Sequence, residues 1–220
     1  MPLPRVKVCC IASPEEAALA VRLGAAAVGL VSAMPSGPGP IAESAIARIV
    51  PTVPPGVATF LLTCRTAADA IVAQQRRTGA NTLQLVDAVP PAELRAIRAA
   101  LPGVALVQVV HVTGASAVDE ALAVAPLVDA ILLDSGNPKL AVKELGGTGR
   151  RHDWAISRRV IEVVDKPVWL AGGLTAANAA EAVATVNPHG LDVCSGVRTD
   201  GRLDAAKLAA LFGAIGAGPG

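Results

Sequence analysis

Short, nearly continuous apolar stretches alternate with helical patterns along the whole chain. Strands that are buried on both faces read as apolar runs, so this alternation predicts a parallel sheet covered by helices. The expected strands are Val6–Ile11, Ala27–Ser32, Val57–Leu62, Thr82–Val86, Leu106–Val112, Ala130–Asp134, Val168–Ala171 and Leu191–Cys194. The expected helices are Pro14–Leu23, Ile41–Ile49, Ala67–Arg76, Pro91–Ala100, Ala115–Ala125, Asp153–Val164, Ala176–Val186 and Ala205–Leu211.

Eight strand–helix pairs in 220 residues fit one compact (β/α)8 barrel, the TIM-barrel fold. A doubly wound open sheet is the alternative, because alternation by itself does not decide whether the sheet closes. Ser13, Thr175 and Asp204 are expected to cap helices, since their side-chain oxygens can accept from N–H groups of a first turn. We expect one domain over residues 1–220 that ends in a flexible tail over 214–220.

Composition narrows the classes of function. A formal net charge of +1 gives no reason to expect nucleic acid or a membrane surface as partner. The three histidines are scattered along the sequence. The four cysteines lack metal-type spacing; they are Cys9, Cys10, Cys64 and Cys194. We therefore expect no metal, no cofactor and no disulfide framework. No signal-peptide pattern or apolar run of about 18 residues occurs, which predicts a cytoplasmic protein. We expect a monomer or homodimer.

Glycine-rich segments follow the last three expected strands. Glycine lets the backbone turn tightly and brings N–H groups close to a ligand, and clustered N–H groups suit phosphate. In a (β/α)8 barrel, the loops after strands seven and eight commonly hold a phosphate group. We therefore predict a small phosphorylated substrate and the following phosphate-binding residues: Gly146, Gly147, Thr148, Gly149, Gly172, Gly173, Ser195 and Gly196.

Cys9 lies near the end of the first strand, two residues after Lys7. Residues two apart on a strand point to the same side, so the ammonium is expected to lie near the thiol. A nearby ammonium stabilises a thiolate and lowers the pKa of the thiol. Cys10 is expected to point the other way, into core packing. The alternative for Cys9 is the usual one for a strand cysteine, a small buried hydrophobic residue.

Asp134 ends the sixth strand after three apolar residues. That position lies at the barrel face where enzymes of this fold carry their chemistry. The alternative is a carboxylate that caps a helix or orders a loop. One base and one acid across a barrel mouth favour proton transfer over covalent catalysis.

The motifs together resemble the phosphoribosylanthranilate isomerase family of tryptophan biosynthesis. The opening Val6-Lys-Val-Cys-Cys-Ile11 is similar to the family's V-K-I-C-G-I. The other matching segments, in order, are Gly24–Gly29, Leu83–Leu85, Leu133–Ser135, Gly146–Gly149 with Asp153-Trp154, Ala171–Leu174 with Asn178, and Asp192–Val197. Each segment alone is a weak signal, but their order along nearly the whole chain indicates the family.

The resemblance implies an aldose–ketose isomerase that performs a cofactor-free Amadori rearrangement of a phosphoribosyl amine. It implies that Cys9 is the general base that removes the sugar C2 proton, and that Asp134 is the general acid that protonates the ring oxygen. Backbone groups around Gly147, Gly173 and Ser195–Gly196 would hold the phosphate. We also expect substrate contacts from three polar side chains: Lys7, Ser36 and Gln84.

The sequence departs from the family in the loop after the second strand. The family carries an arginine there that pairs with the anthranilate carboxylate, whereas residues 33–40 of this chain contain no basic residue. Losing such a charged pair costs about 1.5–3 kcal/mol if nothing replaces it. The family's histidine after the fourth strand is Val86 here, and its glycine after the base is Cys10.

Three hypotheses follow. The protein is a phosphoribosylanthranilate isomerase whose carboxylate site uses Arg150, Arg151 or Arg198. It is a paralogue that isomerises a different phosphorylated sugar or sugar amine. Or it is a non-catalytic barrel that binds a phosphorylated metabolite.

Overall fold

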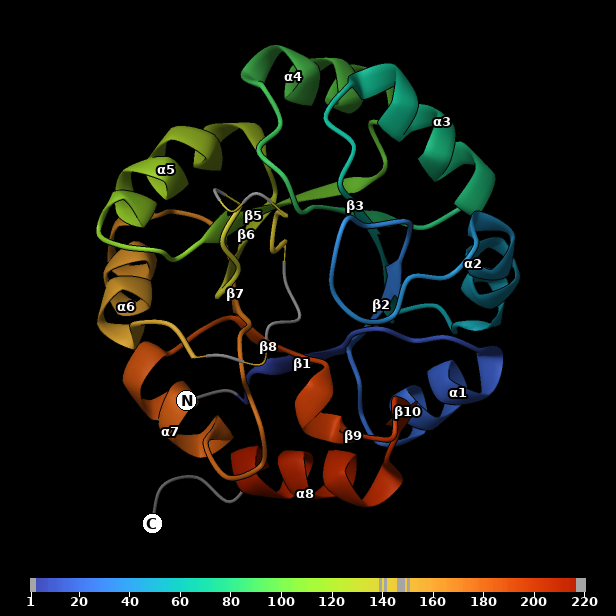
Figure 1. The fold of residues 1–220 in the computed structure, drawn as a ribbon, viewed down its shortest axis with the longest axis vertical. Helices are drawn as coiled ribbons and strands as arrows, with labels where there is room; N and C mark the ends of the chain where they lie inside the picture. The colour runs from blue at the N-terminus through green and yellow to red at the C-terminus, as the bar shows by residue number, and fades with distance from the viewer. Residues whose placement is uncertain (1–2, 139, 141, 146–148, 150, 217–220) are drawn as a thin grey trace.

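The computed structural model describes residues 3–138, 140, 142–145, 149 and 151–216. Eight parallel strands form a closed barrel in chain order, and the first strand pairs with the eighth (Figure 1). This closure confirms the (β/α)8 barrel and excludes the open sheet. The strands are β1 (Arg5–Val8), β2 (Ala27–Val31), β3 (Ala58–Thr63), β4 (Thr82–Leu85), β5 (Ala105–His111), β6 (Ala130–Asp134), β7 (Val168–Leu170) and β8 (Gly190–Val193).

Helices surround the barrel as an outer ring (Figure 1). They are α1 (Pro14–Arg22), α2 (Glu43–Ile49), α3 (Ala68–Thr78), α4 (Pro91–Ala100), α5 (Ser116–Val124), α6 (Trp154–Val163), α7 (Ala179–Val186) and α8 (Ala205–Gly216). Short 3-10 helices add η1 (Val50–Thr52), η2 (Ala125–Leu127) and η3 (Ser195–Val197). A small antiparallel pair, β9 (Arg198–Thr199) with β10 (Arg202–Leu203), was not predicted.

Two of the three expected helix caps are confirmed. Ser13 Oγ accepts from the Glu16 N–H at 3.3 Å, and Asp204 Oδ1 accepts from the Ala206 N–H at 2.9 Å. Each acceptor satisfies an N–H group that has no partner within its helix.

The expected cap at Thr175 is wrong, because α7 begins only at Ala179. Thr175 instead starts a turn, in which its N–H donates to Asn178 Oδ1 at 2.9 Å and its carbonyl accepts from the Asn178 N–H. The predicted end of the last helix was also too early, since α8 continues to Gly216. Residues 217–220 of the expected tail lie outside the described residues.

Side chains pack in two regions, one between the strands and the helices and one inside the barrel. On β1, Val6 and Val8 pack with the outer region, whereas Cys9 belongs to the inner one. Lys7 shares that inner side, with its ammonium 5.3 Å from the centre of the Phe60 ring. The inside of the barrel is therefore partly polar where it approaches the mouth.

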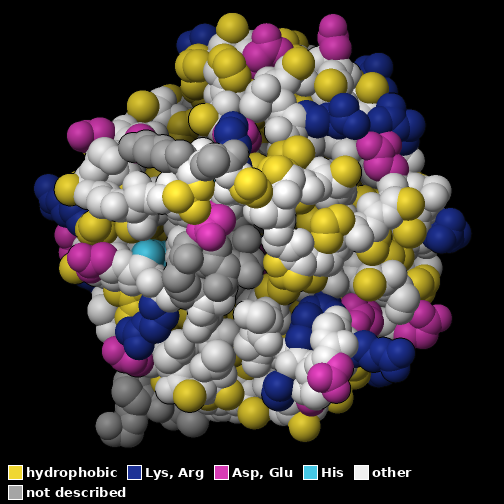
Figure 2. All heavy atoms as spheres, in the orientation of Figure 1, with side chains coloured by type: hydrophobic (Ala, Val, Ile, Leu, Met, Phe, Trp, Pro, Cys, Tyr) yellow, Lys and Arg dark blue, Asp and Glu magenta, His cyan; other side chains and the backbone are white. Residues whose placement is uncertain are grey.

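Figure 2 shows the barrel mouth as a surface, with charged side chains spread around the rim of helices. Within the described part of the chain, no helix is long and apolar enough to cross a membrane.

Candidate active site

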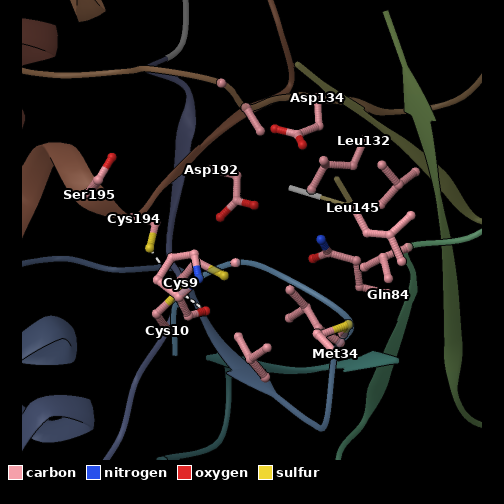
Figure 3. A pocket seen from close by; sticks show the side chains of 18 of the residues that line it. Cys9, Cys10, Met34, Gln84, Leu132, Asp134, Leu145, Asp192, Cys194 and Ser195 are labelled. Carbon is pink, nitrogen blue, oxygen red and sulfur yellow. Dashed lines mark hydrogen bonds between the residues drawn. The ribbon is translucent and has the colours of Figure 1, made fainter. Parts of the chain in front are cut away.

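A cavity of about 760 Å³, including its open mouth, lies at the carboxyl ends of the strands (Figure 3). Its lining contains most of the predicted site residues: Cys9, Ser36, Gln84, Asp134, Gly149, Gly172, Gly173 and Ser195. Lys7 and Gly196 are not part of the lining. Gly146, Gly147 and Thr148 lie outside the described residues.

Cys9 follows β1 directly and faces the cavity although only 6% of it is exposed. Its N–H donates to the Val193 carbonyl at 2.7 Å, which fixes this residue to the end of β8. Gly29 on β2 leaves the room that the thiol needs, because a Cβ there would lie 2.8 Å from Cys9 Sγ and 3.0 Å from Lys7 Nζ. The expected closeness of thiol and ammonium is thus present.

The pKa of the Cys9 thiol lies below its usual value. The largest cause is a hydrogen bond from the Cys10 thiol, which stabilises the Cys9 thiolate against the opposing effect of burial. The charge of Lys7 lowers this pKa further, while that of Asp192 raises it. The balance favours a thiolate, the form that can accept a proton.

Lys7 lies beneath the cavity rather than on its wall, which corrects the expectation of a substrate contact. Its side chain is wholly buried, and Nζ lies 2.8 Å from Asp192 Oδ1. The pair arises because barrel closure places Lys7 opposite Asp192 in the register of β1 and β8. Burial lowers the pKa of Lys7, but Asp192 and Cys9 together hold it above its usual value. Lys7 therefore acts through Cys9 and Asp192 and not by direct contact.

Asp192 was missed as a site residue. Its carboxyl lines the cavity and lies between Cys9 and Asp134 in Figure 3. Burial raises its pKa, while the charge of Lys7 lowers it. The sequence contained a signal for it, a basic residue in the first buried strand and an acidic residue in the last. Because the first and last strands of a closed barrel are neighbours, Lys7 and Asp192 could have been predicted to pair.

Asp134 is the last residue of β6, and 5% of it is exposed. The Gly136 N–H donates to Asp134 Oδ2 at 3.3 Å, so one carboxylate oxygen also orders the following loop. The residue still lines the cavity, so the loop-ordering alternative and a role in the site are compatible.

One side of the cavity, here called the glycine wall, consists of Gly149, Gly172, Gly173 and Ser195. Gly172 and Gly173 follow β7 with φ values of 89° and 63°, a region that side chains disfavour. Among the described residues, no hydrogen-bond acceptor is recorded for their N–H groups. These N–H groups suit an anion with several oxygens.

Gly196 follows Ser195 of the glycine wall, where the loops after β7 and β8 touch. A Cβ at Gly196 would lie 2.0 Å from the Leu174 carbonyl oxygen, a distance that real atoms do not adopt. The sequence placed Gly196 among residues that contact phosphate. The structure shows a further reason for glycine at this position, the close approach of the two loops, and the phosphate contact stays a prediction.

The other side of the cavity, here called the apolar wall, consists of Met34, Gln84, Leu132 and Leu145 (Figure 3). Gln84 is 4% exposed, and its buried Oε1 has no hydrogen-bond partner. Ser36 lines the same side, and its Oγ donates to the Lys143 carbonyl at 2.6 Å. This wall suits a flat apolar group that also offers a hydrogen-bond donor.

Cys10 was expected to point away from Cys9 into core packing. It is buried among the packed residues inside the barrel, but on the same side as Cys9. β1 ends at Val8, so strand alternation no longer applies at Cys10, whose φ is 61°. Its side chain also lines the cavity, with Sγ 2.8 Å from Cys194 Sγ.

Arg198 and Arg151 were two candidates for a carboxylate site. Arg198 pairs with Glu16 at 3.1 Å and donates to the Cys9, Cys10 and Gly201 carbonyls, so both terminal nitrogens of its guanidinium are occupied. Arg151 lies 3.8 Å over the Trp154 ring and pairs with Glu181. Arg150 lies outside the described residues. No described residue of the cavity lining is basic.

Comparison with known proteins points to the family that the sequence motifs resemble. The family of N-(5'phosphoribosyl)anthranilate (PRA) isomerase matches residues 6–214. The N-(5'-phosphoribosyl)anthranilate isomerase of Methanocella arvoryzae is 33% identical over 210 residues, covering 96% of each chain.

Two solved structures share the fold. The phosphoribosyl anthranilate isomerase from Thermotoga maritima has a TM-score of 0.83 and 26% identity, covering 98% of this chain and all of its own. Another, in complex with reduced 1-(o-carboxyphenylamino)-1-deoxyribulose 5-phosphate, has a TM-score of 0.81 and 24% identity, with 98% and 100% covered. With a closed barrel, a cavity at its carboxyl face and a family match over almost its whole length, this chain belongs to the phosphoribosylanthranilate isomerase family.

Proposed function

We propose that the protein converts N-(5'-phosphoribosyl)anthranilate into the corresponding aminoketose phosphate in tryptophan biosynthesis. The observation that carries this proposal is the presence of Cys9 and Asp134 in one cavity with the glycine wall. A base, an acid and a site for an anion are the parts that an Amadori rearrangement of a phosphorylated sugar requires.

Asp134 acts as the general acid in this proposal. Its carboxyl group donates a proton to the ring oxygen of the sugar, and the ring opens as the nitrogen lone pair forms a C1=N bond. The position of Asp134 at the cavity surface, with one oxygen bonded to Gly136, supports this role because the carboxyl is held in one orientation.

Cys9 acts as the general base. Its thiolate removes the proton from C2, and the electron pair of that C–H bond forms the enolamine that tautomerises to the ketose. The lowered pKa of Cys9 supports the role, since a base must be deprotonated at the working pH. Asp192 lies between acid and base and would accept a hydrogen bond from a sugar hydroxyl (Figure 3).

The two walls would hold the two ends of the substrate. The N–H groups of Gly172 and Gly173 suit the phosphate, and a phosphorylated ligand is bound in one solved relative. Met34 and Leu145 would contact the aromatic ring, while Gln84 Oε1 would accept from the substrate N–H. Arg150 stays the candidate for the carboxylate.

The direct test is a turnover assay on the purified protein with freshly prepared substrate, together with complementation of a tryptophan auxotroph that lacks the isomerase. We expect both to succeed. Failure of a folded, well-expressed protein in both tests would reject the proposal. Turnover of another phosphorylated sugar amine in the same assay would then support the paralogue hypothesis.

A further inference from the structure

Three cysteines meet where β1 and β8 end. Cys9 and Cys10 follow β1, Cys194 follows β8, and these strands are neighbours in the barrel. Cys10 Sγ lies 2.8 Å from Cys194 Sγ, a contact drawn as a dashed line in Figure 3. A disulfide bond is about 2.05 Å long, so these two sulfurs need to approach by less than about 1 Å to bond.

The chain around the two sulfurs holds them in place. The Arg198 guanidinium donates to the Cys10 carbonyl at 2.5 Å and to the Cys9 carbonyl at 3.1 Å. Because Arg198 lies only four residues after Cys194, one side chain ties together the loops that carry both thiols. The hydrogen bonds of Arg198 therefore hold the two thiols close together without any bond between the sulfurs.

The two thiols differ in accessibility. Cys10 is 6% exposed, and the loop after β2 covers it, with Cys10 Sγ donating to the Pro38 carbonyl at 3.5 Å. Cys194 is partly exposed, and it lines the cavity. A small molecule that enters the cavity would thus meet the more exposed Cys194 sulfur, which lies 2.8 Å from the Cys10 sulfur.

We propose that Cys10 and Cys194 form a reversible intramolecular disulfide that reduces turnover at the neighbouring Cys9. The formation of the bond is independent of the proposed function, whereas its effect on turnover rests on the isomerase activity.

The oxidant is a small-molecule disulfide, for which oxidised glutathione serves as the probe. The Cys194 thiol, deprotonated, attacks one glutathione sulfur, breaks the S–S bond and releases one glutathione. The Cys10 thiol attacks Cys194 Sγ and passes its proton to the departing glutathione sulfur, which breaks the mixed disulfide and releases the second glutathione. Two protein thiols lose two electrons, and both protons end on the released glutathione molecules. A dithiol reductant reverses the exchange.

The effect on catalysis follows from the position of Cys10 beside Cys9, where its thiol lowers the pKa of Cys9. Contacts with Cys194 and Cys9 raise the pKa of the Cys10 thiol, so it keeps its proton in the reduced protein and can donate it either to the Pro38 carbonyl or to Cys9. Donation to Cys9 is the largest cause of the lowered pKa of Cys9, beside the opposing charges of Lys7 and Asp192. A disulfide has no S–H group, so Cys9 loses this donor on oxidation and becomes protonated at higher pH than before.

The test measures the bond and the activity separately. The purified protein is incubated with oxidised glutathione, and its intact mass and proteolytic peptides are determined by mass spectrometry. We expect a loss of about 2 Da and a peptide linked between Cys10 and Cys194. We also expect turnover at neutral pH to fall by about two- to fivefold, with recovery in dithiothreitol.

Matched variants assign the bond. Cys9 and Cys10 lie in the same tryptic peptide, so the peptide map alone does not tell which of them is linked to Cys194. Cys9→Ala should therefore retain the link to Cys194, and Cys10→Ser should lose it. Cys194→Ser and Cys194→Ala should both lose the link, and in each the residual turnover should no longer respond to the oxidant. Cys64→Ser is the control: Cys64 is also partly exposed, but its Sγ donates to the Ala33 carbonyl at 3.3 Å, away from the pair. It should oxidise like the wild type.

Two results would overturn the proposal. One is oxidation that stops at Cys9, either as a glutathione adduct or as a Cys9–Cys10 link, or no oxidation at all in the folded protein. The other is full formation of the Cys10–Cys194 bond with unchanged turnover, which would reject its effect on Cys9. If the reduced protein has no isomerase activity, the proposed function fails, while the mass measurement still decides whether the bond forms.

Discussion

The two walls of the cavity are built in different ways. The glycine wall presents backbone N–H groups from the loops after β7 and β8 and carries almost no side chains. The apolar wall is made of side chains, with Met34, Leu132 and Leu145 around the amide of Gln84. Backbone geometry is fixed by glycines that tolerate few replacements, whereas side-chain contacts can change one at a time.

This difference explains why the chain matches its family on one side of the cavity and departs from it on the other. The glycine segments after β7 and β8 match the family, and the loop after β2 lacks the expected arginine. Cys9, Asp134 and Asp192 lie between the walls (Figure 3). Substitutions on each wall, and between them, should therefore separate phosphate binding, ring binding and chemistry.

The largest effect should come from the residues between the walls. We expect Cys9→Ala and Asp134→Asn each to reduce kcat by about 10²–10⁴-fold, because each removes a proton-transfer group. Steady-state kinetics measure this, and inorganic phosphate should still raise the Tm of both variants. Asp129→Asn is the matched control, because Asp129 precedes β6 at its opposite end and pairs with Arg98. Equal losses of kcat in Asp129→Asn and Asp134→Asn would contradict the assignment.

Gly196→Ala should weaken the glycine wall. Its new Cβ would force the loops after β7 and β8 apart, so we expect affinity for inorganic phosphate to fall by about tenfold or more. Phosphate titrations followed by Tm measure it. Gly114→Ala, in the loop after β5, meets no atom within 4 Å and should bind phosphate like the wild type. Unchanged phosphate affinity in Gly196→Ala would show that the glycine wall does not hold the anion.

Gln84→Leu should affect the apolar wall alone. Without the amide we expect KM for the aromatic substrate to rise about five- to tenfold, equivalent to one hydrogen bond of about 1 kcal/mol. The affinity for inorganic phosphate should stay the same. Because Oε1 is buried without a partner, the free protein should become slightly more stable in urea unfolding. A parallel loss of phosphate affinity would contradict the separation of the two walls.

The smallest effect should be a pH shift in Cys10→Gly. Glycine accepts the φ of 61° but removes the thiol that donates to Cys9. The pKa of Cys9 is lowered by that donor, so its removal raises the pKa. Cys9 must be deprotonated to act, and the acidic limb of kcat/KM should therefore move to higher pH. If the pH profile of kcat/KM in Cys10→Gly coincides with that of the wild type, Cys10 does not lower the pKa of Cys9.

Much of the fold could be predicted because local patterns agree with it. The helix Pro91–Ala100 was predicted with its observed bounds, and Ser13 caps its helix as expected. The start of α7 was missed because Thr175 and Asn178 can both begin a turn. Only the hydrogen bonds between them show that Thr175 lies one turn before the helix.

The site was predictable where a role depends on position along a strand. Asp134 ends β6, and parallel strands bring their carboxyl ends to one face, so its place at the cavity could be inferred. The roles of Cys10 and Arg198 could not be inferred. Cys10 lies beyond the end of β1, where strand alternation no longer applies. Arg198 binds Glu16 and the Cys9 and Cys10 carbonyls, which are far from it in the sequence.

The sequence by itself determined the alternating strands and helices, the acid and base at strand ends and the glycines that suit phosphate. Each follows from periodicity or from the conformational range of a residue. Only the tertiary structure decided that Lys7 pairs with Asp192 and that Cys10 meets Cys194. The physical reason is closure: hydrogen bonding between β1 and β8 sets a register between segments at opposite ends of the chain, and no local pattern encodes that register.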